Sequence, residues 1–111
     1  MKLSIIGATL ALVLCGPASA ADKAPDEAGA MNLLKASKCM TCHSIDKKKD
    51  GPAYTAVAEK YRDDPEAVAT LTDWVSNSHP VEIDGEEEDH GVVKTKDAAK
   101  IDNLVKWILS H

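Results

Sequence analysis

Apolar residues recur at helical spacing in four stretches of the chain. These stretches are 26–38, 53–61, a segment that begins at Asp64 and a segment that follows Thr95. Residues three and four positions apart lie on the same face of an α-helix, so each stretch can bury one side. The final stripe is the clearest, and consists of Ile101, Leu104, Val105 and Ile108. The pattern predicts a small all-α protein built from short helices.

Polar residues suggest where some of these helices begin. Asp64 is expected to cap the third helix, with Pro65 at its first position. Thr95 is expected to cap the last helix, with Asp97 in its first turn, where a carboxylate suits the helix dipole. The first helix carries acidic residues at its start and lysines at its end, which also suits the dipole.

The segment 77–93 shows neither a helical nor a strand period. Pro80, Gly85 and Gly91 interrupt it, and its middle is acidic. A loop of this length in a small domain is usually functional or disordered. We therefore expect an irregular loop before the last helix.

The first twenty residues have the features of a secretory signal peptide. Lys2 gives the positive start, Leu3 to Cys15 the apolar run, and Ala18-Ser19-Ala20 the cleavage site. The apolar run is shorter than the roughly 20 residues of a membrane span. We expect 1–20 to be removed and 21–111 to form one exported domain with no stable membrane insertion.

Acidic residues outnumber basic ones, 18 against 13, which gives a net charge of −5. This excess tells against nucleic-acid binding, because phosphate contacts need a basic surface. The charge is unevenly spread: residues 47–49 are all lysine, and six acidic residues lie between Glu82 and Asp89. Each run could be solvated surface or a docking patch for a partner of opposite charge.

Residues 39–43, Cys-Met-Thr-Cys-His, have the form C-x-x-C-H. This is the attachment signature of a c-type haem, in which two thiols bond to the porphyrin and the histidine can bind the iron. A zinc site would need a fourth ligand besides Cys39, Cys42 and His43, from His79 or His90. A thioredoxin-like motif would require strands that the pattern does not show. A structural disulfide would not require His43. The motif therefore favours haem.

The order of these features resembles the short bacterial class I monohaem cytochromes c over essentially all of 21–111. Residues 33–46 are similar to that family's N-terminal helix and haem site, 51–54 to its G-P-x-[YF] element, and 98–109 to its C-terminal helix. The resemblance implies a cytochrome c-like fold of three to five helices around one covalent haem c. It also implies that the N- and C-terminal helices pack crosswise.

The resemblance also implies roles for single residues. Cys39 and Cys42 would hold the haem by thioethers, and His43 would be the proximal iron ligand. Pro52 resembles the proline whose carbonyl accepts a hydrogen bond from that histidine and so fixes its ring. Tyr54 completes the same element and Trp74 is placed near a propionate, which makes both candidate cofactor-binding residues.

The chain lacks the distal methionine that the family normally supplies before its last helix. Met1 lies in the signal peptide, Met31 in the first helix and Met40 inside the haem motif. His90 lies about one residue from the position of the family's methionine, and imidazole is a good iron ligand. We expect His90 to be the distal ligand. His79 is the alternative, and an open or water-bound iron is the third possibility.

Together these features favour a periplasmic electron carrier rather than an enzyme. Iron with two strong protein ligands has no vacant position for a substrate, and imidazole in place of a thioether should lower the reduction potential. The expected partners are other redox proteins, as donor and acceptor, and the protein is expected to be a monomer. One alternative is a ligand-binding or sensing haem protein with a displaceable or absent distal ligand. Another is a subunit of a larger redox complex.

Overall fold

The computed structural model describes residues 24–111, so the expected signal peptide lies outside the described residues. Helices supply most of the regular structure, and one short hairpin interrupts them. In chain order the elements are α1 (Glu27–Ala36), the 3-10 turn η1 (Cys39–Thr41), α2 (Tyr54–Lys60), α3 (Ala67–Ser76), β1 (Pro80–Ile83), β2 (Glu86–Asp89) and α4 (Ala98–Leu109).

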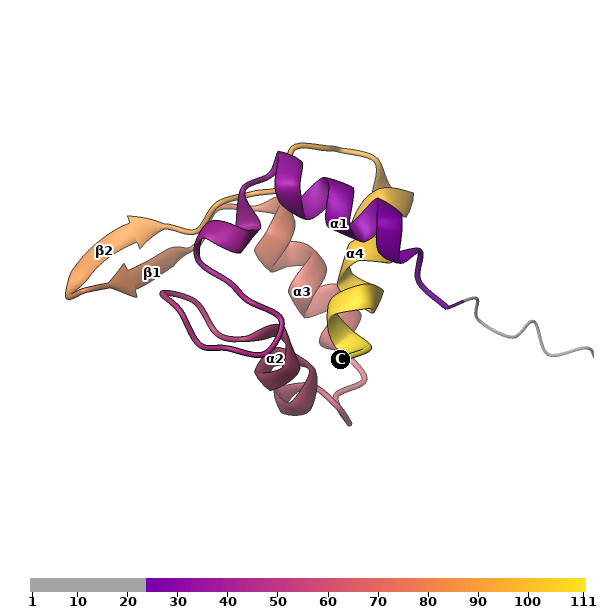
Figure 1. The fold of residues 1–111 in the computed structure, drawn as a ribbon, viewed down its shortest axis with the longest axis horizontal. Helices are drawn as coiled ribbons and strands as arrows, with labels where there is room; N and C mark the ends of the chain where they lie inside the picture. The colour runs from indigo at the N-terminus through magenta and orange to yellow at the C-terminus, as the bar shows by residue number, and fades with distance from the viewer. Residues whose placement is uncertain (1–23) are drawn as a thin grey trace, which may run out of the picture.

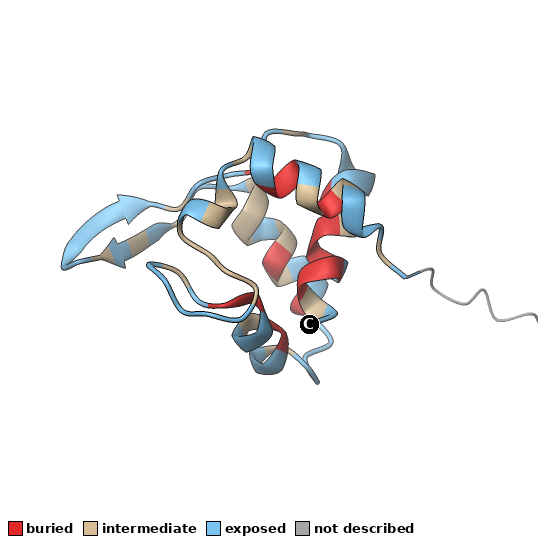
Figure 2. Ribbon diagram, in the orientation of Figure 1, coloured by how far each residue is buried: buried red, intermediate tan, exposed pale blue. Residues whose placement is uncertain are grey.

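The core forms around α4, which contacts each of the other three helices. Figure 1 shows α1 crossing α4 near the N-terminal end of α4, with α2 and α3 packed along its other sides. Leu34 of α1 and Leu104 and Val105 of α4 are fully buried. In Figure 2 the buried positions, in red, lie on the parts of the helices that meet one another, and the hairpin has none. The predicted crosswise packing of the terminal helices is therefore confirmed.

A side-chain clamp holds the start of α1 against α4. Asn103 accepts a hydrogen bond from the backbone N–H of Asp26 (2.7 Å) and donates one to its carbonyl (2.9 Å). The Asp26 side chain in turn caps α1 by accepting from the backbone N–H of Gly29. One asparagine on α4 thus satisfies both backbone groups of the residue at which α1 begins.

Two of the predicted helix starts need correction. The α3 helix begins at Ala67, and Asp64 forms a turn before it by accepting from the backbone N–H of Glu66 (2.8 Å). In α4 the cap is Asp97, which accepts from two backbone N–H groups, whereas Thr95 accepts from the N–H of Asp97 itself. In each case the residue expected to cap the helix instead closes a turn just before it, through its side chain.

The fold is mostly helical, as predicted, but the segment 77–93 is not the irregular loop that we expected. Strands β1 and β2 pair antiparallel, with Ile83 opposite Glu86. Asp84 and Gly85 connect them with backbone φ angles of 54° and 81°. Two consecutive positive φ angles define the turn that matches the natural twist of a two-residue hairpin. The Asp-Gly pair is therefore the local signal that produces this sheet.

The hairpin projects away from the helices (Figure 1). Within the described residues, β1 and β2 contact each other but no other helix or strand. Val81 and Ile83 are half-buried, while all four residues of β2 are exposed. None of the helices between residues 24 and 111 is both long and apolar enough to cross a membrane.

Candidate haem-binding site

The C-x-x-C-H motif lies in a tight turn directly after α1. Lys38 adopts a left-handed backbone conformation (φ 59°), which ends α1 and starts η1. The carbonyl of Cys39 then accepts from the backbone N–H groups of Cys42 (3.2 Å) and His43 (3.0 Å). This turn brings the two cysteines and the histidine together on a short, hydrogen-bonded stretch of backbone.

The His43 ring is fixed by the segment that follows it. Its Nδ1 lies 2.7 Å from the carbonyl oxygen of Pro52, which leaves Nε2 available for a metal. Gly51 packs directly against the ring, since an added Cβ would come within 2.5 Å of Cε1. The backbone N–H of Gly51 also donates to the carbonyl of Cys42 (2.7 Å), which folds this loop back onto the motif.

Tyr54 connects the His43 ring to the helical core. The two rings are stacked, with centroids 5.1 Å apart, and Tyr54 meets Trp107 of α4 edge-on at 5.9 Å. Tyr54 and Trp107 are 4% and 3% exposed. Burial, and to a lesser extent the nearby Cys39, raises the pKa of the Tyr54 hydroxyl. Trp107 thus fills a core position.

Cys39 and Cys42 are not joined to each other by a disulfide, and both are partly exposed. Burial is the main cause of the raised pKa of Cys39, so its thiol stays protonated at neutral pH. Among residues 24–111, no group of three or more histidine, cysteine or acidic side chains is arranged to hold a metal ion. The zinc alternative therefore finds no support.

On the other side of the site, the His90 ring faces His43. The ring centroids are 6.1 Å apart, with the planes at 60°. Two imidazoles that bind one metal from opposite sides have centres roughly 6 Å apart, because each metal–nitrogen bond is about 2 Å and each ring centre lies about 1 Å behind its nitrogen. The observed spacing therefore fits one iron between these two histidines.

The environment of His90 also fits a ligand. Its Nδ1 is buried and has no hydrogen-bond partner. Its pKa is lowered, chiefly by burial and then by His43, while backbone groups of Gly91 and Trp74 oppose the shift. A lowered pKa keeps the imidazole neutral at pH 7, and metal binding requires the neutral ring.

His79, the alternative ligand, is engaged elsewhere. Its Nε2 lies 2.9 Å from a carboxylate oxygen of Asp73, and its ring lies against Trp74 with a centroid distance of 4.4 Å. Trp74 meets the His90 ring edge-on at 5.5 Å. The indole thus contacts both histidines and lies beside the distal candidate.

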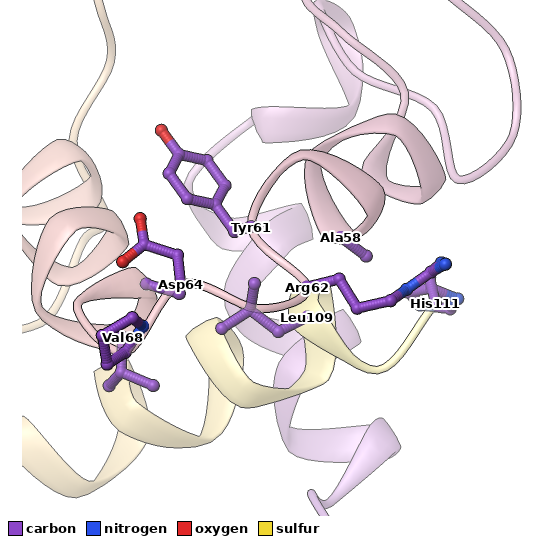
Figure 3. Close-up of a pocket in the computed structure, with 9 residues that line it drawn as sticks. Ala58, Tyr61, Arg62, Asp64, Val68, Leu109 and His111 are labelled. Carbon is purple, nitrogen blue, oxygen red and sulfur yellow. The ribbon is translucent and has the colours of Figure 1, made fainter.

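A shallow pocket of about 250 Å³ lies between the α2–α3 connection and the C-terminal end of α4. Figure 3 shows Tyr61, Arg62 and His111 around it. The His111 ring packs edge-on against Trp107 at 4.5 Å. None of the residues of the C-x-x-C-H motif lines this pocket, and neither does His90.

The structure brings together the predicted Cys39, Cys42, His43, Pro52, Tyr54 and His90, and places Trp74 next to His90. The sequence pattern placed Gly51 in the 51–54 element but did not predict its packing against the His43 ring, which depends on the loop folding back. It also missed Lys49, whose Nζ donates to the carbonyl of Met40 (2.8 Å). Lys49 is therefore tied to the haem motif rather than being only part of a basic surface patch.

Comparison with known proteins agrees with this arrangement. The family model described as cytochrome c matches residues 27–111. Cytochrome c-551 of Pseudomonas aeruginosa is 34% identical over 83 residues, which cover 71% of this chain and 73% of the relative. Cytochrome c-551 of Pseudomonas denitrificans is 49% identical over 43 residues. That match covers 39% of this chain and about half of the relative, 52%.

Solved structures show the same likeness. The class 1 cytochrome MtoD from Sideroxydans lithotrophicus ES-1 superposes with a TM-score of 0.74 and 43% identity, and the match covers 78% of this chain and 97% of that one. Nitrosomonas europaea cytochrome c552 superposes with a TM-score of 0.58 and 25% identity, over 72% and 96% of the two chains. In agreement with the sequence prediction, this is a family of small electron-transfer proteins rather than enzymes. The chain belongs to the cytochrome c family and binds one covalent haem c.

Proposed function

We propose that this protein is an exported monohaem cytochrome that carries single electrons between redox proteins, with His43 and His90 as its axial ligands. The observation that carries the ligand assignment is the 6.1 Å separation of the two imidazoles. Cys39 and Cys42 hold the haem through thioethers in this proposal, next to the proximal ligand. The periplasm is the proposed location, because the N-terminal twenty residues read as a secretory signal.

The bound haem supplies a one-electron iron couple, and the protein sets its potential and access. His43 is held by the Pro52 carbonyl, which orients the ring and makes Nε2 more basic. His90 supplies a second imidazole in place of the thioether usual in this family. Imidazole in place of the thioether favours the ferric state, so we expect a potential below that of methionine-ligated relatives.

The chain's own residues support electron transfer rather than chemistry on a substrate. With both His43 and His90 bound to the haem iron, as their 6.1 Å spacing would allow, no coordination position would remain for a reactant. Tyr54 and Trp107 fill the space behind His43 with buried rings, and thus limit water on the proximal side. Electrons would then leave only through the haem edge, in contact with a docked partner.

The test is the low-temperature EPR spectrum of the ferric, haem-loaded protein and of its His90→Ala variant. We expect a low-spin, bis-imidazole signal that becomes high-spin in His90→Ala. His111→Ala is the matched control, because it removes a histidine that packs on Trp107 and not on a residue of the motif. A low-spin signal that persists unchanged in His90→Ala would show that another group is the distal ligand. A high-spin wild-type spectrum would instead support a protein that binds or senses small ligands.

A redox titration provides the second test. The proposed ligand set predicts a midpoint potential well below that of the methionine-ligated relatives measured in the same buffer. A potential as high as theirs would contradict both the ligand set and the effect assigned to it. Size-exclusion chromatography of the native exported fraction would then separate a free carrier from a subunit of a larger complex.

A further inference from the structure

The position of His90 needs an explanation, because no other helix or strand of the described chain supports the hairpin that leads to it. Strand β2 ends at Asp89, one residue before His90, and within residues 24–111 the hairpin contacts no other helix or strand. An isolated two-stranded hairpin is marginally stable in water. Its own strands therefore cannot set the orientation of a ring at its end.

We infer that Asp73, Trp74 and His79 form a positioning cluster that holds the His90 ring toward His43. This inference rests on the proposed function, in which His90 is the distal ligand. The cluster lies where the C-terminal end of α3 meets the two ends of the hairpin. Its members contact the iron ligand rather than the iron, so their role is to limit how the ring turns and how often it leaves.

The backbone first fixes the base of the hairpin. The N–H of His90 donates to the carbonyl of His79 (2.7 Å), which continues the pairing of β1 and β2. The N–H of Val93 donates to the carbonyl of Val75 on α3 (2.8 Å), and Val93 is only 8% exposed. These bonds bring the chain on both sides of the hairpin to the end of α3.

Trp74 then restricts the His90 ring. The edge-on contact between them, at 5.5 Å and 87°, is an arrangement that aromatic rings prefer. On its other side the indole packs against His79 at 4.4 Å and 31°. Because His79 and His90 both contact the indole and are joined by a backbone hydrogen bond, the ring of His90 cannot rotate without disturbing this packing.

Asp73 anchors the outer end of the cluster. One carboxylate oxygen lies 2.9 Å from His79 Nε2, and the other accepts from Asn77 Nδ2 (2.7 Å). The side chains of His79 and Asp73 are 28% and 54% exposed, so the pair contributes little stability by itself. Its effect is on position, because the close approach of Asp73 limits movement of the His79 ring that lies against Trp74.

The experiment compares His79→Ala, Trp74→Leu and Trp74→Phe in the haem-loaded protein. Two readouts are used: the EPR signal of the ferric form, which reports the angle between the two imidazole planes, and the rate of carbon monoxide binding to the ferrous form, which reports how often His90 leaves. The matched controls are His111→Ala, which also removes a histidine packed on a tryptophan, and Asp102→Asn, which breaks an exposed ion pair.

We expect Trp74→Leu to bind carbon monoxide about tenfold faster, a factor that corresponds to about 1.4 kcal/mol and to the upper end of one aromatic pair. His79→Ala should bind carbon monoxide about threefold faster than wild type. Trp74→Phe should recover most of the wild-type rate. Each fast variant should shift the EPR signal, while neither control should. A role in stability alone would change unfolding but neither of these readouts.

His90→Ala is measured in parallel to separate the two proposals. If it becomes high-spin but the Trp74 and His79 variants match the controls, the positioning cluster is wrong and the ligand assignment stands. If it stays low-spin, His90 is not the ligand and both proposals are overturned. If Trp74→Leu does not fold, the comparison of Trp74→Phe with His79→Ala decides, since wild-type rates in both would also refute the cluster.

Discussion

Replacement of Gly51 by alanine would test how closely the proximal site is packed. The added Cβ would come within 2.5 Å of Cε1, 2.8 Å of Nδ1 and 3.0 Å of Nε2 of His43. Atoms this close cannot coexist, so the imidazole has to move. Because Nδ1 lies only 2.7 Å from the Pro52 carbonyl, movement of the ring disturbs this hydrogen bond as well.

The expected cost can be estimated from three effects. Overpacking of a filled site costs about 1–3 kcal/mol, and a disturbed hydrogen bond costs about 0.5–1.5 kcal/mol. Alanine restricts the unfolded chain and so offsets about 0.4–1 kcal/mol of this loss. We therefore expect Gly51→Ala to lower the free energy of unfolding by about 2 kcal/mol. In a domain of this size, that shifts the melting temperature by roughly 8–16 °C.

The assay is thermal unfolding of the ferric, haem-loaded protein, followed by circular dichroism and by the Soret band. Gly91→Ala is the matched control, because a Cβ at Gly91 would meet no atom within 4 Å. The control should keep or slightly raise the melting temperature. Equal melting temperatures for Gly51→Ala and wild type would refute the argument that this glycine is needed for close packing against His43.

Two further predictions concern the core. Asn103→Ala should lower the free energy of unfolding by about 1–3 kcal/mol, because it breaks both hydrogen bonds to Asp26; urea unfolding should show no comparable loss for the exposed Asn32→Ala. The raised pKa of Tyr54 implies that the unfolded chain loses this proton first, at about pH 10. Stability is then fully present below pH 10 and falls at higher pH. Tyr54→Phe should weaken this alkaline loss in unfolding measured at pH 8 and 11, whereas an unchanged loss relative to Tyr61→Phe would contradict it.

The helices could be predicted because their apolar spacing directly reflects burial. The stripe from Ile101 to Ile108 and the face with Leu33 and Leu34 both enter the core. Val68 is the exception, at 36% exposed, because α3 turns Ala67 and Leu71 inward instead. Which of two adjacent α3 residues turns inward depends on the helices packed around it. The apolar spacing within α3 alone does not show this.

The hairpin could not be predicted from hydrophobic alternation. Val81 and Ile83 in β1 do alternate with other residues, but β2 reads Glu-Glu-Glu-Asp and has no apolar face. The Asp84-Gly85 pair was the available signal, because both residues take the positive φ angles of a tight turn. Here turn chemistry determines the strands, and burial plays almost no part.

Part of the candidate site could be predicted from the sequence, because the residues around the proximal histidine lie close together along the chain. Cys39, Cys42, His43 and Pro52 lie within fourteen residues, and their contacts follow from one turn and one loop. The approach of His90 to His43 joins segments 47 positions apart, so sequence could suggest it only by resemblance. The contacts of Trp74 with two histidines depend on where α3 ends, which no local pattern predicts.

The unpartnered hairpin also has a consequence for self-association. Each of its two strands has one edge with no partner strand in the described part of the chain, and such edges can recruit strands from other molecules. Glu82 lies directly opposite Glu87, and Pro80 opposite Asp89, so one face of the ribbon is strongly negative. A second copy that approached edge to edge would bring these carboxylates together and be repelled. The same charges that weaken pairing within the hairpin therefore oppose pairing of its open edges with a second copy.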